Sequence, residues 1–232
     1  MSKVNLINGD CMKFMRECSD NQFDLAVADP MYDLSEAELC PGSKITKHGV
    51  NREHIEQARK LSKLEIVGTD FYTELCRISK NQIIWGINYF SFSNKIKGRI
   101  VWDKQNDGST FSNCELASSS FHDGTRIFRH LWNGFIQKDM KNKEKRIHAF
   151  QKPVPLYKWI LERYAKEGDS IIDTHGGSMS SVVASIDMEY DITCIEQDED
   201  CFNSAVVRIQ DHVTQLDMFI PVPTITINGE QQ

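Results

Sequence analysis

The residues Asp29-Pro30-Met31-Tyr32 follow the apolar run Phe23–Ala28 and combine groups that could handle a nucleobase amine. An exocyclic amine is a weak nucleophile because its lone pair is delocalised into the ring, so an enzyme must hold its hydrogens with acceptors. The Asp29 carboxylate and the Pro30 carbonyl could each accept one hydrogen, and proline fixes its own φ. Tyr32 could stack on a base rotated out of a duplex. Taken alone, such a tetrapeptide is more often a turn that ends a strand.

A second candidate site lies in residues 170–181, whose pattern predicts a strand, a tight loop and a helix start. The adjacent Gly176 and Gly177 allow a ligand to approach the backbone closely, at the strand end where α/β sheets bind nucleotides. Glu196 ends the next predicted strand about twenty residues on, where an acid can bind ribose hydroxyls. Because Met179 replaces a glycine of GxGxxG, the segment alone indicates a nucleotide site and a plain turn equally well.

The predicted secondary structure places both motifs at strand ends. Strands are expected at 4–8, 23–28, 82–86, 99–102, 115–121, 170–173 and 191–195, and helices at 12–18, 52–64, 70–79, 154–166, 182–188 and 199–213. The run Phe23–Ala28 is apolar throughout, which is typical of a strand buried on both faces of a parallel sheet. Strands and helices alternate at both ends of the chain, so we predict an α/β layered domain.

The composition is that of an ordinary globular domain. The chain has 232 residues, of which 40% are hydrophobic and 26% charged. No apolar run reaches the ~18 residues that span a membrane, and the N-terminus lacks an apolar stretch of signal-peptide length. We therefore expect a cytoplasmic protein with no membrane partner. The seven cysteines are scattered and never spaced CxxC, which favours reduced thiols over a zinc site.

The charge distribution gives one indication of a partner. A formal net charge of −6 argues against a general polyanion binder. Residues 129–158 are locally basic, however, with only Asp139 and Glu144 opposing their lysines and arginines. A basic run is usually a solvated loop, but this one lies between the two motifs, and its position favours a surface that contacts phosphates.

Taken together, the two motifs resemble those of the DNA amino-methyltransferases, in the class whose catalytic half precedes the cofactor half (the β arrangement). Residues 29–32 are similar to the family's DPPY, and residues 173–181 to its glycine loop in the form DTHxGSxSS. Three further blocks match in the same order: Gly9-Asp10-Cys11 resembles GDC, residues 82–90 resemble QIIWGGNYF, and residues 146–153 resemble RIHPTQKP. The blocks span most of residues 3–210, and phage and prophage members look most similar.

The resemblance implies a Rossmann-like fold for S-adenosylmethionine-dependent methyltransferases, circularly permuted, with a mainly parallel sheet of about seven strands. A single domain would cover residues 1–220, with DNA-recognition insertions at 35–64 and 128–146 and a loose tail at 221–232. The implied cofactor is S-adenosylmethionine and the implied partner is double-stranded DNA. No metal is implied, and the protein would act as a monomer or homodimer in the cytoplasm of a bacterial host.

The same resemblance assigns residues to roles. Asp29, Pro30, Met31 and Tyr32 would be catalytic. The implied cofactor-binding residues, with Glu196 on the ribose and Asp10 near the adenine, are Asp10, Cys11, Asp29, Asn88, His148, Gln151, Lys152, Asp173, Thr174, His175, Gly176, Gly177, Ser178, Ser180, Glu196 and Gln197.

The implied activity is transfer of a methyl group to the N6 amine of adenine in DNA, as part of restriction-modification, because an Asp at position 29 favours adenine in this family. A methyltransferase for the cytosine N4 amine or for RNA is an alternative. A catalytically weak DNA-binding pseudoenzyme is another, since the sequence departs from the family's pattern. Met31 replaces a proline that would restrict Pro30 to an extended conformation, Met179 replaces a loop glycine, and Ala149-Phe150 replaces Pro-Thr.

Overall fold

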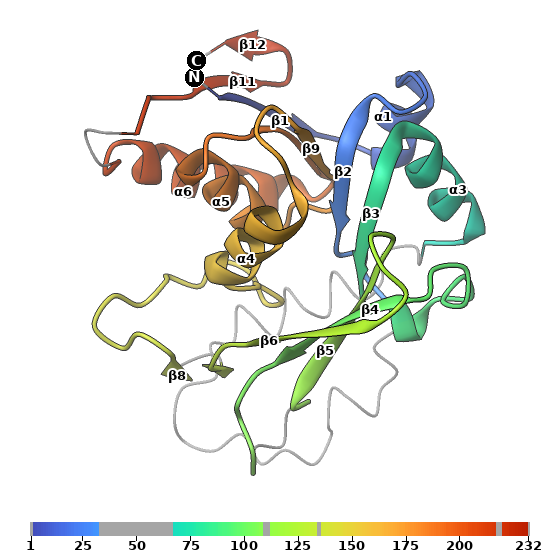
Figure 1. Ribbon diagram of the computed structural model, residues 1–232. Coiled ribbons are helices and arrows are strands. Elements are labelled where there is room, and N and C mark those ends of the chain that lie inside the picture. The colour runs from blue at the N-terminus through green and yellow to red at the C-terminus, as the bar shows by residue number, and fades with distance from the viewer. Residues whose placement is uncertain (1, 33–66, 109–111, 134–135, 217–219, 232) are drawn as a thin grey trace.

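The computed structural model describes residues 2–32, 67–108, 112–133, 136–216 and 220–231. In this part of the chain a ten-stranded sheet runs through the molecule in the order β12-β11-β1-β10-β9-β2-β3-β5-β4-β6 (Figure 1). The strands are β1 (Lys3–Asn8), β2 (Phe23–Ala28), β3 (Ser79–Trp85), β4 (Gly98–Asp103), β5 (Cys114–Ser119), β6 (Thr125–Arg129), β9 (Ser170–Asp173), β10 (Asp191–Glu196), β11 (Thr224–Ile227) and β12 (Glu230–Gln231).

The sheet is mixed. Its strands are parallel from β11 through β1, β10, β9 and β2 to β3. Beyond β3 the direction changes, because β5 is antiparallel to both β3 and β4. A separate antiparallel pair is formed by β7 (Trp132–Asn133) and β8 (Ile136–Gln137). These short strands lie within residues 128–146, the segment predicted to be a DNA-recognition insertion.

Helices cover both faces of the sheet and create two hydrophobic cores (Figure 1). The helices are α1 (Cys11–Glu17), α3 (Thr69–Ile78), α4 (Val154–Tyr164), α5 (Ser180–Asp187) and α6 (Glu199–Val213), with a 3-10 turn η1 at Ile87–Tyr89. Alternate residues of β2 serve the two cores: Leu25 and Val27 pack with α4, α5 and α6, whereas Ala26 and Ala28 pack with α1 and α3. This double burial explains why β2 is apolar throughout.

Most predicted elements are confirmed, and three have the predicted bounds: β2, β9 and α6. Two predictions are wrong. Among the described residues the sheet has ten strands rather than about seven, and the described part of the predicted tail at 221–232 is not loose, because β11 pairs with β1 in a parallel register that places Thr226 opposite Asn5. The predicted helix at 52–64 and the predicted insertion at 35–64 lie outside the described residues.

This topology gathers the predicted site residues at one edge. The neighbouring strands β1, β10, β9, β2 and β3 are parallel, so the loops that follow them meet at their carboxyl ends, where open α/β sheets bind ligands. Within the described ranges no helix is long and apolar enough to cross a membrane, and no group of acidic, histidine or cysteine side chains is arranged to hold a metal ion.

Candidate functional site

The glycine loop after β9 lies directly against β10. The Gly176 N–H donates to the Ile195 carbonyl at 2.8 Å. A Cβ atom added to Gly176 would lie 2.6 Å from the Cys194 sulfur, which is closer than van der Waals contact allows. Gly177 has a φ of +52°, a left-handed conformation that glycine adopts without strain. Both glycines are therefore required by the way the loop folds.

Glu196, at the end of β10, ties this loop to its neighbours. One carboxylate oxygen accepts the Gly177 N–H at 2.7 Å, and the other accepts the Asp198 N–H at 2.8 Å. Its backbone carbonyl accepts the Gly9 N–H at 3.0 Å, and the next residue, Asp10, caps α1 by accepting the Met12 N–H. Burial raises the pKa of Glu196. The structure thus brings together the glycine loop, Glu196 and Asp10, as the sequence predicts.

Asp173, at the end of β9, holds the glycine loop through two hydrogen bonds. Its two carboxylate oxygens accept the His175 N–H at 3.0 Å and the Ser181 hydroxyl at 2.5 Å. Burial raises the pKa of Asp173 to about 7. Burial also lowers the pKa of His175 to about 4, so this imidazole is neutral at physiological pH. The Thr174 hydroxyl oxygen lies 2.9 Å from Nδ1 of the His175 ring, and the Cys11 sulfur lies 4.0 Å from Nε2 of the same ring.

Met179 takes the place of a loop glycine in conformation as well as in sequence. Its φ of +56° and ψ of 38° are left-handed, and it forms the N-cap of α5. Its side chain is fully buried in the core shared with Ile171 and Val182. The predicted departure at this position therefore costs some backbone strain, but the methionine fills the core and does not crowd the loop's outer side.

We expect Met179→Gly to destabilise the protein by about 2 kcal/mol, which is the difference between the middle values of the packing loss and of the strain relief. The change would relieve about 1–2 kcal/mol of left-handed strain, but emptying a buried methionine site costs about 2–5 kcal/mol. Urea unfolding measures the difference. Met179→Leu is the matched control, because it keeps both the strain and the apolar volume and should cost less than about 1.5 kcal/mol. A glycine variant as stable as the natural protein would contradict the assigned packing.

The carboxylate of Asp29 lies at the end of β2 and is paired with Lys152. The Lys152 ammonium donates to one Asp29 oxygen and also lies 3.1 Å from Glu115. Burial raises the pKa of Asp29, against the attraction of Lys152. Pro30 is buried and Met31 half-buried beside it. Sequence analysis places Lys152 at the cofactor, whereas the structure places its charge on the predicted catalytic residue.

Two tyrosines stack at this corner of the sheet. The rings of Tyr32 and Tyr89 are parallel to within 3°, with centroids 4.0 Å apart. Gly86, at the end of β3, makes this possible: its φ is +68°, and a Cβ atom there would lie 2.8 Å from the Tyr32 ring. Tyr89 is 45% exposed, so the pair stands at the surface of the site. The block 82–90 therefore lies beside Asp29-Pro30-Met31-Tyr32, because β3 pairs with β2 and Tyr89 stacks on Tyr32.

The block at residues 146–153 reaches the glycine loop from the other side. The His148 ring packs on Gly177, since a Cβ atom there would lie 3.4 Å from it. Gln151 shapes its own segment: its side chain accepts the Ile147 N–H at 2.9 Å and donates to the Lys145 carbonyl at 3.2 Å. The Gln151 side chain therefore makes its hydrogen bonds within its own segment of the chain.

The remaining predicted cofactor residues differ in their surroundings. Ser178 and Ser180 face α6, where Arg208 donates to the Ser178 carbonyl at 2.7 Å and to the Ser180 hydroxyl at 3.0 Å. Asn88 in η1 and Gln197 after β10 are exposed at their strand ends. The structure therefore gathers most of the predicted residues along one edge, but it gives Ser178, Ser180, Gln151 and Lys152 partners within the protein.

Three residues of this neighbourhood were not predicted from the sequence: Lys104, Glu115 and Arg208. Glu115 joins Lys152 to Lys104, and Arg208 joins the glycine loop to Glu144 at 3.1 Å. None of them belongs to the motifs that place the other site residues. Their roles come from pairing between distant strands and helices.

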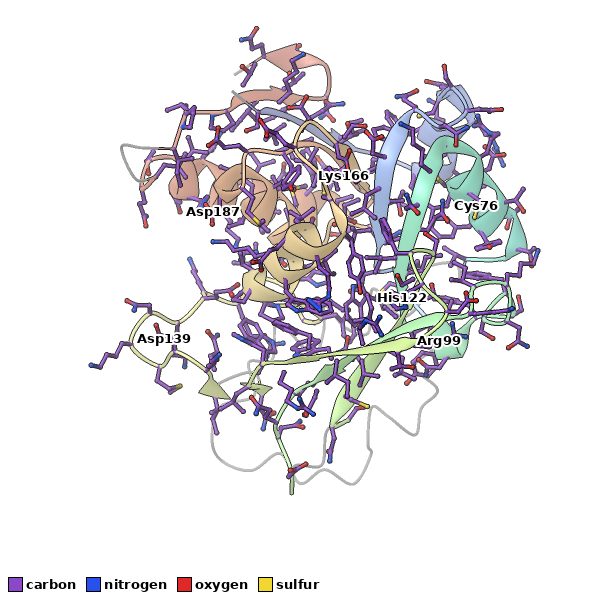
Figure 2. The ribbon with its side chains drawn as sticks, in the orientation of Figure 1. Cys76, Arg99, His122, Asp139, Lys166 and Asp187 are labelled. Carbon is purple, nitrogen blue, oxygen red and sulfur yellow. The ribbon has the colours of Figure 1, made fainter. Side chains whose placement is uncertain are left out.

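A basic loop projects beside the site. The side chains of Lys138, Lys141, Lys143 and Lys145 are exposed. The loop that carries them extends outward from β8, and Asp139, labelled in Figure 2, bends it by accepting the backbone N–H groups of Lys141 and Asn142. Glu144, the other acid of this segment, turns inward to Arg208. The surface of the loop therefore carries positive charge.

Comparison with known proteins connects this arrangement to one family. Residues 118–207 match the profile of the DNA methylase family N6_N4_Mtase. This part of the chain is therefore similar to the N6/N4 DNA methylases. The chain is 25% identical to the type II methyltransferase M2.DpnII of Streptococcus pneumoniae, over 76% of this chain and 78% of the relative. It is also 25% identical to M2.MboI of Moraxella bovis, over 84% and 83%.

Solved structures share the fold. The crystal structure of M1.HpyAVI with S-adenosylmethionine superposes with a TM-score of 0.58 at 16% identity, covering 89% of this chain and 98% of that one. The cytosine-N4-specific PvuII DNA methyltransferase superposes with a TM-score of 0.57 at 11% identity, covering 95% and 89%. At these identities the likeness establishes the α/β architecture and its mixed sheet.

Proposed function

We propose that this protein is a DNA methyltransferase that uses S-adenosylmethionine and methylates the N6 amine of adenine. The observation that carries the proposal is the adjacency of β2 and β9, which places Asp29-Pro30-Met31-Tyr32 beside the glycine loop at one sheet edge. In the chain, β2 precedes β9, so the catalytic half comes first. This order supports the permuted β arrangement.

The residues along this edge fit the proposed cofactor. Glycines 176 and 177 carry no side chains of their own, and the Glu196 carboxylate stands at the end of the neighbouring strand with a second acid, Asp10, beside it. Carboxylates suit the ribose hydroxyls and the adenine amine of a nucleoside. When bound, S-adenosylmethionine supplies an electrophilic methyl group.

The catalytic corner fits an amine substrate. An ionised Asp29 and the Pro30 carbonyl are acceptors for the two amine hydrogens, and holding the nitrogen in place supplies much of the rate. Tyr32 offers a flat ring for a flipped base. Tyr89 now covers one face of that ring, so the base would stack on the opposite face or displace Tyr89. Transfer would be direct, without a covalent enzyme intermediate.

The choice of adenine rests on Asp29. One structural neighbour, the PvuII DNA methyltransferase, is cytosine-N4-specific, and cytosine N4 is the second candidate because the same acceptors would hold its amine. An aspartate at this position, in place of a serine, supports adenine. The relatives' names as type II methyltransferases support a restriction-modification setting, and we propose a bacterial cytoplasm as its location.

Double-stranded DNA is the proposed partner, and residues 128–146 are the proposed contact. The exposed lysines of this segment suit the phosphate backbone. The protein would act as a monomer or homodimer.

The test is incorporation of a radiolabelled methyl group from S-adenosylmethionine into several unmethylated DNAs, with RNA as a parallel substrate. We expect label in DNA. If the protein binds the cofactor but labels no DNA, the proposal of an active enzyme is wrong and the DNA-binding pseudoenzyme takes its place.

A further inference from the structure

Four side chains of alternating charge form a chain of ion pairs that ends at Asp29: Lys104, Glu115, Lys152 and Asp29. The Lys104 ammonium lies 2.6 Å from one Glu115 oxygen. The Lys152 ammonium lies 3.1 Å from the other and also donates to Asp29. The four residues come from four places: the end of β4, strand β5, the segment before α4 and the end of β2. The sheet joins these places only in the folded protein.

This chain of charges is poorly suited to a purely structural role. Only 6% of the Lys152 side chain and 19% of the Asp29 side chain are exposed. Removing charges from water is costly, and apolar side chains of similar size often stabilise such a place at least as well. Buried, paired charges beside a ligand edge are instead typical of functional sites. We therefore expect this chain of charges to serve the chemistry of the site.

We propose that Lys152, held in place by Glu115 and Lys104, is the positioning residue that fixes Asp29 as an ionised acceptor for the base amine. The inference rests on the proposed function. The Lys152 ammonium donates to the Oδ2 atom of Asp29. The Oδ1 atom would then accept a hydrogen of the base amine. Glu115 sets the direction of Lys152, because its second oxygen is itself fixed by Lys104.

The electrostatics agree with this geometry. A protonated Asp29 would lose acceptor capacity, and burial raises its pKa, with Glu115 adding to the effect, while Lys152 and Lys104 lower it. Burial would also raise the pKa of Glu115, but the two lysines lower it to about 2. The titratable groups that face Asp29 are Lys152, Lys104, Glu115, Asp173, Tyr32 and Tyr157. Removing Lys152 therefore raises the pKa of Asp29, and activity is lost at a higher pH as the solution is acidified.

The experiment compares Lys152→Met, which keeps the length of the side chain without its charge, with Lys152→Arg, which keeps the charge. Lys80→Met is the matched control, since it removes an ion pair with Asp24 at 2.6 Å, at the start of β3 and away from the edge that carries the site. For each folded variant the pH dependence of single-turnover methyl transfer is measured. The ionisation of Asp29 is followed separately by carboxyl carbon NMR without cofactor or DNA, with Asp29→Asn identifying its signal.

We expect the acid limb of the rate profile and the Asp29 titration to move up by at least about one pH unit in Lys152→Met. Both should stay near their natural values in Lys152→Arg and Lys80→Met. Unchanged titration of Asp29 in Lys152→Met would overturn the inference. So would weaker cofactor binding with an unchanged rate constant, which would make Lys152 a cofactor residue. If the natural protein transfers no methyl group, the proposed function fails, while the NMR titration still tests the effect of Lys152.

Discussion

Asp29→Ala is expected to reduce the rate constant of methyl transfer by about 1,000-fold, within the range for groups that handle a proton in the transition state. The substitution removes the acceptor that would hold one amine hydrogen. It also leaves Lys152 with Glu115 as its remaining carboxylate partner among the described residues, so some loss of stability should accompany it. The rate constant is measured in a single turnover, with cofactor and DNA both saturating.

The matched control is Asp20→Ala, which removes another aspartate that pairs with a cation. Asp20 is 73% exposed and its partner is Arg77, away from the sheet edge of the site. We expect natural activity in this variant, because exposed ion pairs contribute little. If Asp29→Ala folds, binds cofactor and DNA, and retains a rate within about threefold of the natural protein, Asp29 is not the amine acceptor.

Glu196→Ala is expected to weaken binding of S-adenosylmethionine by about 100-fold, because hydrogen bonds to a charged group contribute about 1.5–3 kcal/mol. The change removes the proposed ribose acceptor and also the acceptor of the Gly177 N–H. Glu196→Gln keeps an acceptor oxygen and should lose about tenfold. Calorimetric titration measures each affinity, and Glu199→Gln, which alters an exposed acid in the first turn of α6, is the control.

The pH dependence of this binding gives an independent check. Since burial raises the pKa of Glu196, its carboxylate becomes protonated at a higher pH than an ordinary glutamate. Cofactor affinity should therefore fall as the pH is lowered through that raised pKa. The Glu196→Gln variant cannot titrate and should lose this pH dependence. Equal affinities for the natural protein and Glu196→Ala would contradict the assigned ribose contact.

Much of the site was predictable because it depends on local sequence. The apolar run of β2 and the short strand β9 each end in their motif, and residues that follow adjacent parallel strands must meet. The requirement for glycine at 177 is likewise local, since it follows from the left-handed turn between β9 and α5, whereas Gly176 is required by its contact with Cys194 on β10.

The parts that sequence analysis missed depend on pairing between distant segments. Glu115 meets Lys152 only because β5 lies between β3 and β4 in the sheet. Strand β11 is short, and it pairs with β1 from the opposite end of the chain. Similarly, Met179 could be identified as a replaced glycine, but that its side chain fills the core depends on how α5 packs on the sheet. No local pattern encodes such contacts.

The most direct test of the central claim is the identity of the methylated base. Unmethylated duplex DNA is incubated with the protein and with S-adenosylmethionine carrying an isotopic methyl group, and is then digested to nucleosides for mass spectrometry. We predict labelled N6-methyl-2′-deoxyadenosine from the natural protein and none from Asp29→Ala. Labelled N4-methylcytosine would contradict the assignment of adenine, and no labelled nucleoside from any DNA would contradict methyl transfer itself.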